Sequence, residues 1–130
     1  DHHLMMLFIS HDLAVVRSLA HEVLVLYLGK VMEVGGAHEV LDQPLHPYTK
    51  ALQQAAPQLR LSDEPPAPHA PLPGDPPSPL APPAGCAFHP RCPHAIAICR
   101  SEIPALRLLE GRQVACHRAH EWPAGQDGIL

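Results

Sequence analysis

A proline-rich tract divides this sequence and limits what the chain can fold into. Eleven of its 17 prolines fall between residues 57 and 83. Proline has no backbone N–H and a fixed φ, so the tract excludes a regular helix or a central strand. We expect it to form an extended, semi-rigid polyproline II spacer, with a ligand for a proline-recognition domain as the alternative. The core-forming residues then lie in two segments, 1–56 and 84–120, followed by a tail at 121–130.

The second segment carries every cysteine of the chain. Five, six and sixteen residues separate them in turn, and they are Cys86, Cys92, Cys99 and Cys116. A unit of roughly 35 residues seldom folds without a metal or disulfides. In a reducing compartment four thiols are more readily metal ligands than two disulfides. The segment is therefore predicted to be a small, irregular Cys-rich region that binds a metal or an iron–sulfur cluster.

The cysteine spacing leaves three interpretations open. A [4Fe–4S] cluster needs four thiolates and tolerates loops longer than two residues. Structural zinc sites usually pair ligands two to four residues apart, and no Cys-x-x-Cys occurs here, although His89, His94 and His117 could replace a thiolate. The third interpretation is structural thiols without a metal. A thiol redox enzyme is disfavoured, because the sequence shows no basic or helix N-terminal setting that would activate a thiolate.

The first segment has the alternating strand and helix signals of an α/β fold. Residues 4–9 form a continuous apolar run, which is typical of a strand buried on both faces of a parallel sheet. A buried helix beginning at residue 4 is the alternative. Asp12 is an expected N-cap, with apolar residues at helical spacing behind it. The further expected elements are a strand at 23–27, a turn at 29–30, a strand at 31–34, and helices at 37–42 and 46–56.

Charge and hydropathy exclude two further classes. The net charge is −4, with 9 basic and 13 acidic residues, whereas a nucleic-acid-binding surface needs clustered Lys and Arg. The longest apolar run after residue 9, at 23–28, is far below the roughly 20 residues that span a bilayer. Residues 1–3 are not a positively charged leader. We expect a soluble, cytoplasmic chain with no nucleic-acid partner.

Five motifs, in one order, resemble a known family. Residues 9–16, Ile-Ser-His-Asp-Leu-Ala-Val-Val, resemble the switch-histidine loop of ABC transporter ATPases. The hairpin at 27–35 resembles the one that follows that loop in the same proteins. Three further stretches resemble oligopeptide and dipeptide permease ATPases within that superfamily: the His-Pro-Tyr motif at 44–52, the linker at 72–79 and the cysteine motif at 85–93, continuing through Cys99 to Cys116. Over residues 4–120 the chain is thus similar to the C-terminal part of an oligopeptide/dipeptide ABC transporter ATP-binding protein.

The resemblance implies a domain plan and a function. Residues 1–56 would be the end of the ABC ATPase domain, 57–83 the linker and 84–120 the Cys-rich region. The family's ATP-binding subunits energise transport of di- or oligopeptides. The phosphate-binding loop, the ABC signature and the Walker B strand are all missing from these 130 residues. We therefore expect a C-terminal fragment without ATPase activity of its own; a freestanding iron–sulfur or zinc-binding interaction module is the alternative function.

The resemblance also implies site residues, cofactors and partners. His11 would sense the γ-phosphate of ATP bound with Mg²⁺ in the full-length protein; a histidine that only caps the turn is the alternative. Members with this cysteine pattern carry a [4Fe–4S] cluster, which places the cluster on the four cysteines. Implied partners are transmembrane permease subunits, a second ATP-binding subunit and, indirectly, a peptide-binding protein. The implied location is peripheral, on the cytoplasmic face of the cell membrane.

Overall fold

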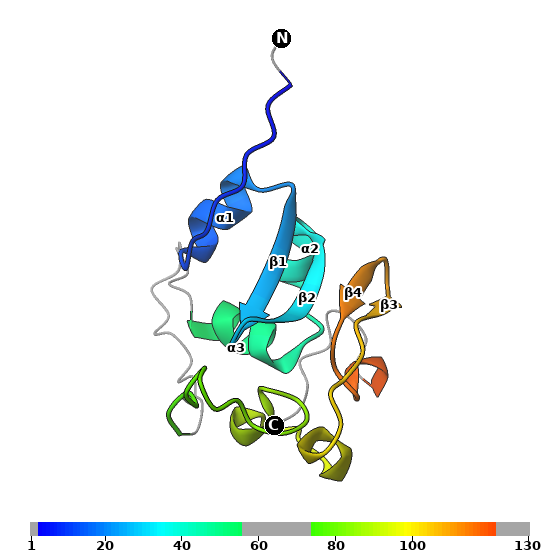
Figure 1. Cartoon of the computed structure of the whole chain (residues 1–130). Helices are drawn as coiled ribbons and strands as arrows, with labels where there is room; N and C mark the ends of the chain where they lie inside the picture. The colour runs from blue at the N-terminus through cyan, green and yellow to red at the C-terminus, as the bar shows by residue number, and fades with distance from the viewer. Residues whose placement is uncertain (1–2, 56–73, 122–130) are drawn as a thin grey trace, which may run out of the picture.

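The computed structural model describes residues 3–55 and 74–121, and its centre is a four-stranded antiparallel sheet in the order β1-β2-β4-β3 (Figure 1). The elements are α1 Leu13–Leu19, β1 Glu22–Tyr27, β2 Lys30–Gly36, α2 Ala37–Asp42, α3 Pro47–Ala55, β3 Arg107–Leu109 and β4 Arg112–Val114, with 3-10 turns η1 His89–Arg91, η2 Ala97–Arg100 and η3 Ala119–Glu121. The α/β prediction of few strands and short helices is confirmed. The sheet is antiparallel, however, and not the parallel sheet expected.

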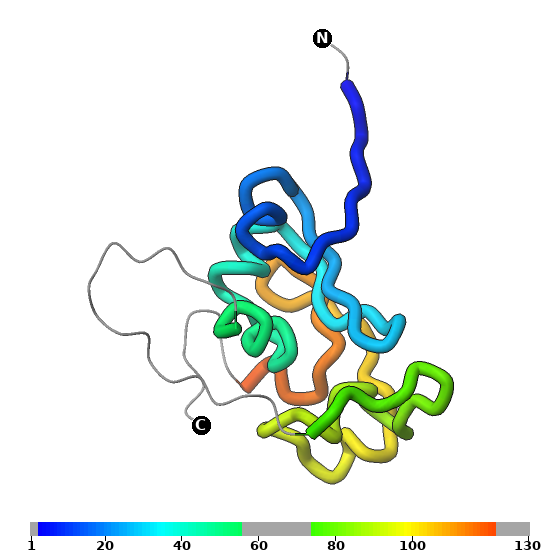
Figure 2. Tube along the Cα trace, turned by 90° about the vertical axis from the view of Figure 1, so that its left-hand side faces the viewer, coloured from blue at the N-terminus to red at the C-terminus, as the bar shows by residue number. Residues whose placement is uncertain are grey.

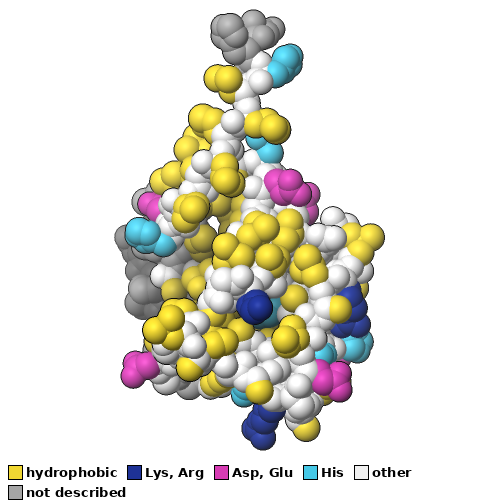
Figure 3. Space-filling view, viewed as in Figure 1, with side chains coloured by type: hydrophobic (Ala, Val, Ile, Leu, Met, Phe, Trp, Pro, Cys, Tyr) yellow, Lys and Arg dark blue, Asp and Glu magenta, His cyan; other side chains and the backbone are white. Residues whose placement is uncertain are grey.

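The hairpin of β1 and β2 follows the predicted positions closely. Leu28 and Gly29 form its two-residue turn, both with positive φ, so the turn lies one residue earlier than predicted. Along β1, Val23, Val25 and Tyr27 are buried, while the leucines between them are half exposed. Figure 3 shows hydrophobic side chains gathered on the face of the molecule seen in this view and along the N-terminal segment. One face of the hairpin therefore builds the core.

A second hairpin, β3 and β4, comes from the Cys-rich segment and completes the sheet. Its turn is Glu110-Gly111, again with positive φ at both residues. β4 pairs antiparallel with β2, with Glu33 opposite Val114. The sequence analysis missed this hairpin, because Glu-Gly is a weak turn signal and three-residue strands show no periodicity. The two segments on either side of the proline tract thus share one sheet.

The same two segments share a hydrophobic core. Phe88, fully buried, contacts Tyr27 and Tyr48, with ring centroids 5.3 Å apart in both pairs. Tyr27 and Tyr48 pack edge to face at 4.7 Å. One aromatic side chain of the Cys-rich segment therefore fills the centre of a core built by β1 and α3. The boundaries at residues 56 and 84 stay a prediction, whereas the described parts of both segments pack as one body.

A buried ion pair joins β2 to β4. The Glu33 carboxylate, fully buried, accepts a hydrogen bond from Arg112 Nη1 at 3.2 Å and further bonds from the backbone N–H groups of Leu45 and His46. Arg112 Nη1 also donates to the carbonyls at the end of α2, those of Glu39 and Gln43. A buried charge is tolerated only with such partners. This network holds together two strands, the end of α2 and the approach to α3.

A β-bulge explains how Glu33 comes to be buried. The register of β1 and β2 shifts between Val25 and Leu26, so that Val25 lies opposite Glu33 and Leu26 opposite Val31. Met32 is the extra residue, and its carbonyl accepts a hydrogen bond from Ala115. A bulge interrupts the alternation of sides. Met32 and Glu33 are therefore both buried, which strict alternation along the strand does not allow.

The strand predicted at residues 4–9 is wrong. The structure gives this segment no strand, and its side chains are exposed. A strand that is apolar on both faces needs partner strands beside it and helices above and below, and none of the described strands pairs with this segment. Figures 1 and 2 show its beginning extending away from the rest of the molecule. The apolar run by itself cannot form a strand.

Several other predictions from the sequence are confirmed within the described residues. Asp12 caps α1, helix α2 has the predicted bounds of residues 37–42, and α3 spans Pro47–Ala55 against the predicted 46–56. Of the proline tract, residues 74–83 contain no helix or strand, as expected. Residues 57–73 and most of the tail lie outside the described residues. No described helix is long and apolar enough to cross a membrane.

Replacing Arg112 by Met should destabilise the fold strongly, because it leaves the Glu33 carboxylate buried without its charged partner. We expect the free energy of unfolding to fall by about 3–5 kcal/mol, measured by urea denaturation. Arg17→Met is the matched control, since Arg17 forms an exposed pair with Asp42 at 2.8 Å and should cost far less. Equal losses in the two variants would refute this role for the buried pair.

Candidate functional site

The loops that carry the cysteines are positioned by a few backbone contacts. The N–H of Cys86 donates to the carbonyl of Cys99 at 2.8 Å, which joins the first and third cysteine loops. Gly85 precedes it with φ of 72°, and a Cβ at this position would clash with the same carbonyl. Only glycine allows this close approach. Cys92 is the C-cap residue of η1, and Cys116 lies two residues after β4.

All four cysteine side chains line one pocket. The backbone of residues 85–100, which carries three of them, lies at the end of the molecule opposite the N-terminus (Figures 1 and 2). The cysteines are free thiols, Cys86 and Cys99 being buried and the other two half-buried. The pocket is also lined by His46, Pro47, Phe88, His89, His94, His117 and Arg118. The fold therefore brings together the whole cysteine set and the three histidines that the sequence analysis named as possible ligands.

The electrostatics of the pocket disfavour thiolates unless a cation is present. Burial raises the pKa of Cys116 to about 12 and that of Cys92 to about 11, and the neighbouring thiols add to both shifts. Burial likewise raises the pKa of Cys86. At neutral pH these three groups are protonated. The pocket therefore presents soft donor atoms as neutral thiols.

The three histidines are held in different ways. His89 Nδ1 hydrogen-bonds the Cys86 carbonyl at 2.8 Å, and His117 Nε2 hydrogen-bonds the Glu102 carbonyl at 2.9 Å. Burial lowers the pKa of His94, and the cationic Arg118 and Lys50 add to that effect. Within residues 3–55 and 74–121, no three His, Cys, Asp or Glu side chains form a group that could hold a metal ion. The thiols thus share a pocket without meeting at one coordination point.

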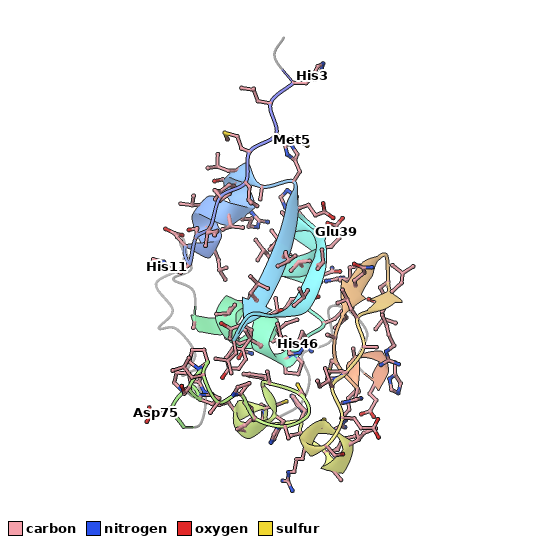
Figure 4. All side chains as sticks on the ribbon, viewed as in Figure 1. His3, Met5, His11, Glu39, His46 and Asp75 are labelled. Carbon is pink, nitrogen blue, oxygen red and sulfur yellow. The ribbon has the colours of Figure 1, made fainter. Side chains whose placement is uncertain are left out.

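His46 is a residue of the pocket that the sequence analysis did not assign to it. Its Nδ1 accepts a hydrogen bond from the N–H of Tyr48 at 3.0 Å, which caps the first turn of α3. Burial lowers the pKa of His46 to about 4, against the opposing effect of a hydrogen bond with the Ala115 backbone. The ring is therefore neutral, and since Nδ1 accepts, Nε2 carries the proton toward Ala115. Figure 4 shows His46 between α3 and the segment that carries Cys116.

His11 lies far from this pocket, exposed at the start of α1 (Figure 4). The neighbouring Asp12 carboxylate accepts hydrogen bonds from the N–H groups of Ala14 and Val15, at 3.0 and 3.3 Å. The first turn of α1 is therefore capped by Asp12 and not by His11. The role of His11 toward a γ-phosphate stays a prediction.

Comparison with known proteins gives the family. A family model described as "Oligopeptide/dipeptide transporter, C-terminal region" matches residues 32–99, which include most of the bulged strand, the His-Pro-Tyr motif and three of the four cysteines. The match covers more than half of the 130 residues. The fold and pocket thus define a small antiparallel sheet domain with a four-cysteine pocket. This chain belongs to the oligopeptide/dipeptide transporter C-terminal-region family.

Curated relatives agree with this assignment. The chain is 53% identical to a di/tripeptide transport ATP-binding protein, DppF, of Pseudomonas aeruginosa, over 88% of this chain and 35% of the relative. It is 48% identical to the oligopeptide transport ATP-binding protein AppF of Bacillus subtilis, over 85% and 34%. The dipeptide transport ATP-binding protein DppD of Escherichia coli is 44% identical, over 86% and 34%. The chain spans about a third of the length of these relatives.

The pocket thiols should react slowly with iodoacetamide in the folded chain without metal. Because the pKa of Cys92 rises from about 9 to about 11, two pH units, its thiolate fraction at pH 8 should be about a hundredfold lower than in the unfolded chain. The rate should rise about tenfold per pH unit up to about pH 11. To measure these rates, each cysteine is alkylated in chelator with and without urea, and mass spectrometry then gives the extent of reaction at each position. Equal rates in the two states would contradict the raised pKa.

Proposed function

We propose that this chain acts as the C-terminal region of the ATP-binding subunit of an ABC transporter that moves di- or oligopeptides across a membrane. The observation that carries the proposal is the family match over residues 32–99. Relatives named as peptide transport ATP-binding proteins, similar over 85–88% of the chain, support it. In such a subunit ATP and Mg²⁺ bind chiefly to the other parts of the domain, and this chain contributes His11 to the nucleotide site.

The partners follow from the same assignment. The subunit would pair with a second ATP-binding subunit and sit peripherally on transmembrane permease subunits, at the cytoplasmic face of the membrane. A peptide-binding protein would act with them indirectly. The names of the relatives, all peptide transport or import ATP-binding proteins, support this arrangement.

We further propose that Cys86, Cys92, Cys99 and Cys116 hold a [4Fe–4S] cluster. The observation that supports this is that all four thiols line one pocket, and four thiolates are the ligand set that such a cluster requires. Zinc is the alternative, with a pocket histidine in place of a thiolate.

The residues of the chain itself prepare the site for such a group. Phe88 and Pro47 give the pocket an apolar wall, which limits the access of water. The Cys86–Cys99 backbone bond fixes two of the loops relative to each other before any metal binds. When bound, the cluster would supply four iron–thiolate bonds between these loops. Its role would then be structural or redox-sensing, since all four ligand positions come from the protein.

The metal content of the anaerobically purified chain tests the cluster. We expect about four irons and four sulfides per chain, with a broad absorption near 400 nm. Cys116→Ser should lower the iron content, whereas Ser18→Ala, on α1 and more than sixty residues before the first cysteine, should not. One zinc without sulfide would assign the site to the structural zinc class. No metal in freshly purified protein would overturn the metal-site proposal.

The proposed role of His11 is testable in an intact subunit that contains this sequence. His11→Ala should lower ATP hydrolysis by the assembled transporter by about 10²–10³-fold, as for removal of a group that stabilises the transition-state charge. His38→Ala is the control, because His38 is an exposed histidine on α2. Unchanged hydrolysis in the His11 variant would restrict this residue to a local role in the turn before α1.

A further inference from the structure

Arg118 ties together two of the cysteine loops. It lies two residues after Cys116, and its Nη1 donates to the carbonyl of His94, two residues after Cys92, at 2.9 Å. The two loops are separated by more than twenty residues of chain. A guanidinium fork is suited to this task, because its several N–H donors have fixed directions and can bridge groups on different segments. Arg118 thus positions the second cysteine loop against the fourth.

Arg118 is also the one permanently charged cation among the described residues that line the pocket. The other basic lining groups are histidines, and the ring of His46 is neutral at pH 7 because burial lowers its pKa to about 4. Four thiolates around a metal group carry considerable negative charge. Because the pocket is partly shielded from water, a nearby cation interacts with that charge more strongly than it would in bulk water. A guanidinium on the wall of the pocket therefore offsets charge where the thiolates would form.

Glu121 holds the other side of the same guanidinium. Its carboxylate accepts from Arg118 Nε at 2.6 Å and forms an ion pair with Nη2 at 2.5 Å, while Nη1 is bonded to the His94 carbonyl. Glu121 ends η3, the short turn after Cys116. The carboxylate opposes part of the Arg118 charge that reaches the pocket. The two side chains are partly exposed, so either can be changed with little effect on the core.

We infer that Arg118 positions the Cys92 and Cys116 loops and offsets the negative charge of a thiolate-bound group in the pocket, with Glu121 setting how much of that charge is effective. The inference rests on the proposed [4Fe–4S] cluster. Reduction adds an electron and makes the cluster more negative, so a nearby cation stabilises the reduced form and raises the midpoint potential. Removing the cation and removing its counter-charge should then shift the potential in opposite directions.

The test is a redox titration of the intact, anaerobically purified chain, with iron and sulfide measured on each sample. Arg118→Gln should lower the midpoint potential, and Glu121→Gln should raise it. We expect changes of about tenfold in the ratio of reduced to oxidised cluster at a fixed potential, or about 59 mV for one electron. Arg118→Lys, which keeps the charge and loses the fork, should stay near the unmodified potential and lose iron faster to a chelator.

The controls separate this inference from the proposed function. Arg17→Gln removes an arginine that is likewise paired with a carboxylate, on α1 and away from the pocket, and should leave the potential unchanged. If the Arg118→Gln variant does not retain the cluster, its midpoint potential cannot be measured. The upward shift of the midpoint potential expected for Glu121→Gln then tests the inference by itself. A filled cluster with equal potentials, or with shifts of the same sign in both variants, overturns the inference alone. An unmodified chain that contains zinc or no metal overturns the proposed cluster and this inference with it.

Discussion

The buried ion pair of Glu33 and Arg112 is the constraint on which the rest of the structure depends. A carboxylate with no exposed surface requires partners, and these come from β4, from the residues before α3 and, through Arg112, from the end of α2. The pair fixes the position of β4 beside β2, and with it the start of the segment that leads to Cys116. Its position depends on the bulge at Met32, which turns Glu33 inward.

Few regular hydrogen bonds attach the cysteine pocket to the strands that this ion pair joins. Ala115 is attached to β2 through the Met32 carbonyl and to α3 through the ring of His46, and Cys116 follows immediately. The Cys86 loop is anchored on the other side by Phe88 in the aromatic core. The cysteine loops, which have little secondary structure, are thus attached to a well-packed sheet.

Local patterns in the sequence predicted the elements that depend on neighbouring residues. They failed for strands whose pairing partner is distant in the sequence. The cap at Asp12, the β1–β2 hairpin and the helix at residues 37–42 all depend on neighbouring residues, and all are present. The apolar run at residues 4–9 was interpreted as a strand because of its composition, but a strand exists only where another strand pairs with it. The β3–β4 hairpin is local but has a weak turn signal and very short strands, and its pairing with β2, some 80 residues earlier in the chain, leaves no local pattern.

The sequence by itself determined the family, the set of four cysteines and the division by proline, because these depend on residue types and their order. Only the tertiary structure decided that the segments on either side of the proline tract share one sheet and one core. It alone also decided that His46 and Arg118 join the cysteines at a single pocket. The physical reason is that burial of Glu33 and Phe88 depends on contacts between residues far apart in sequence, which no local pattern encodes.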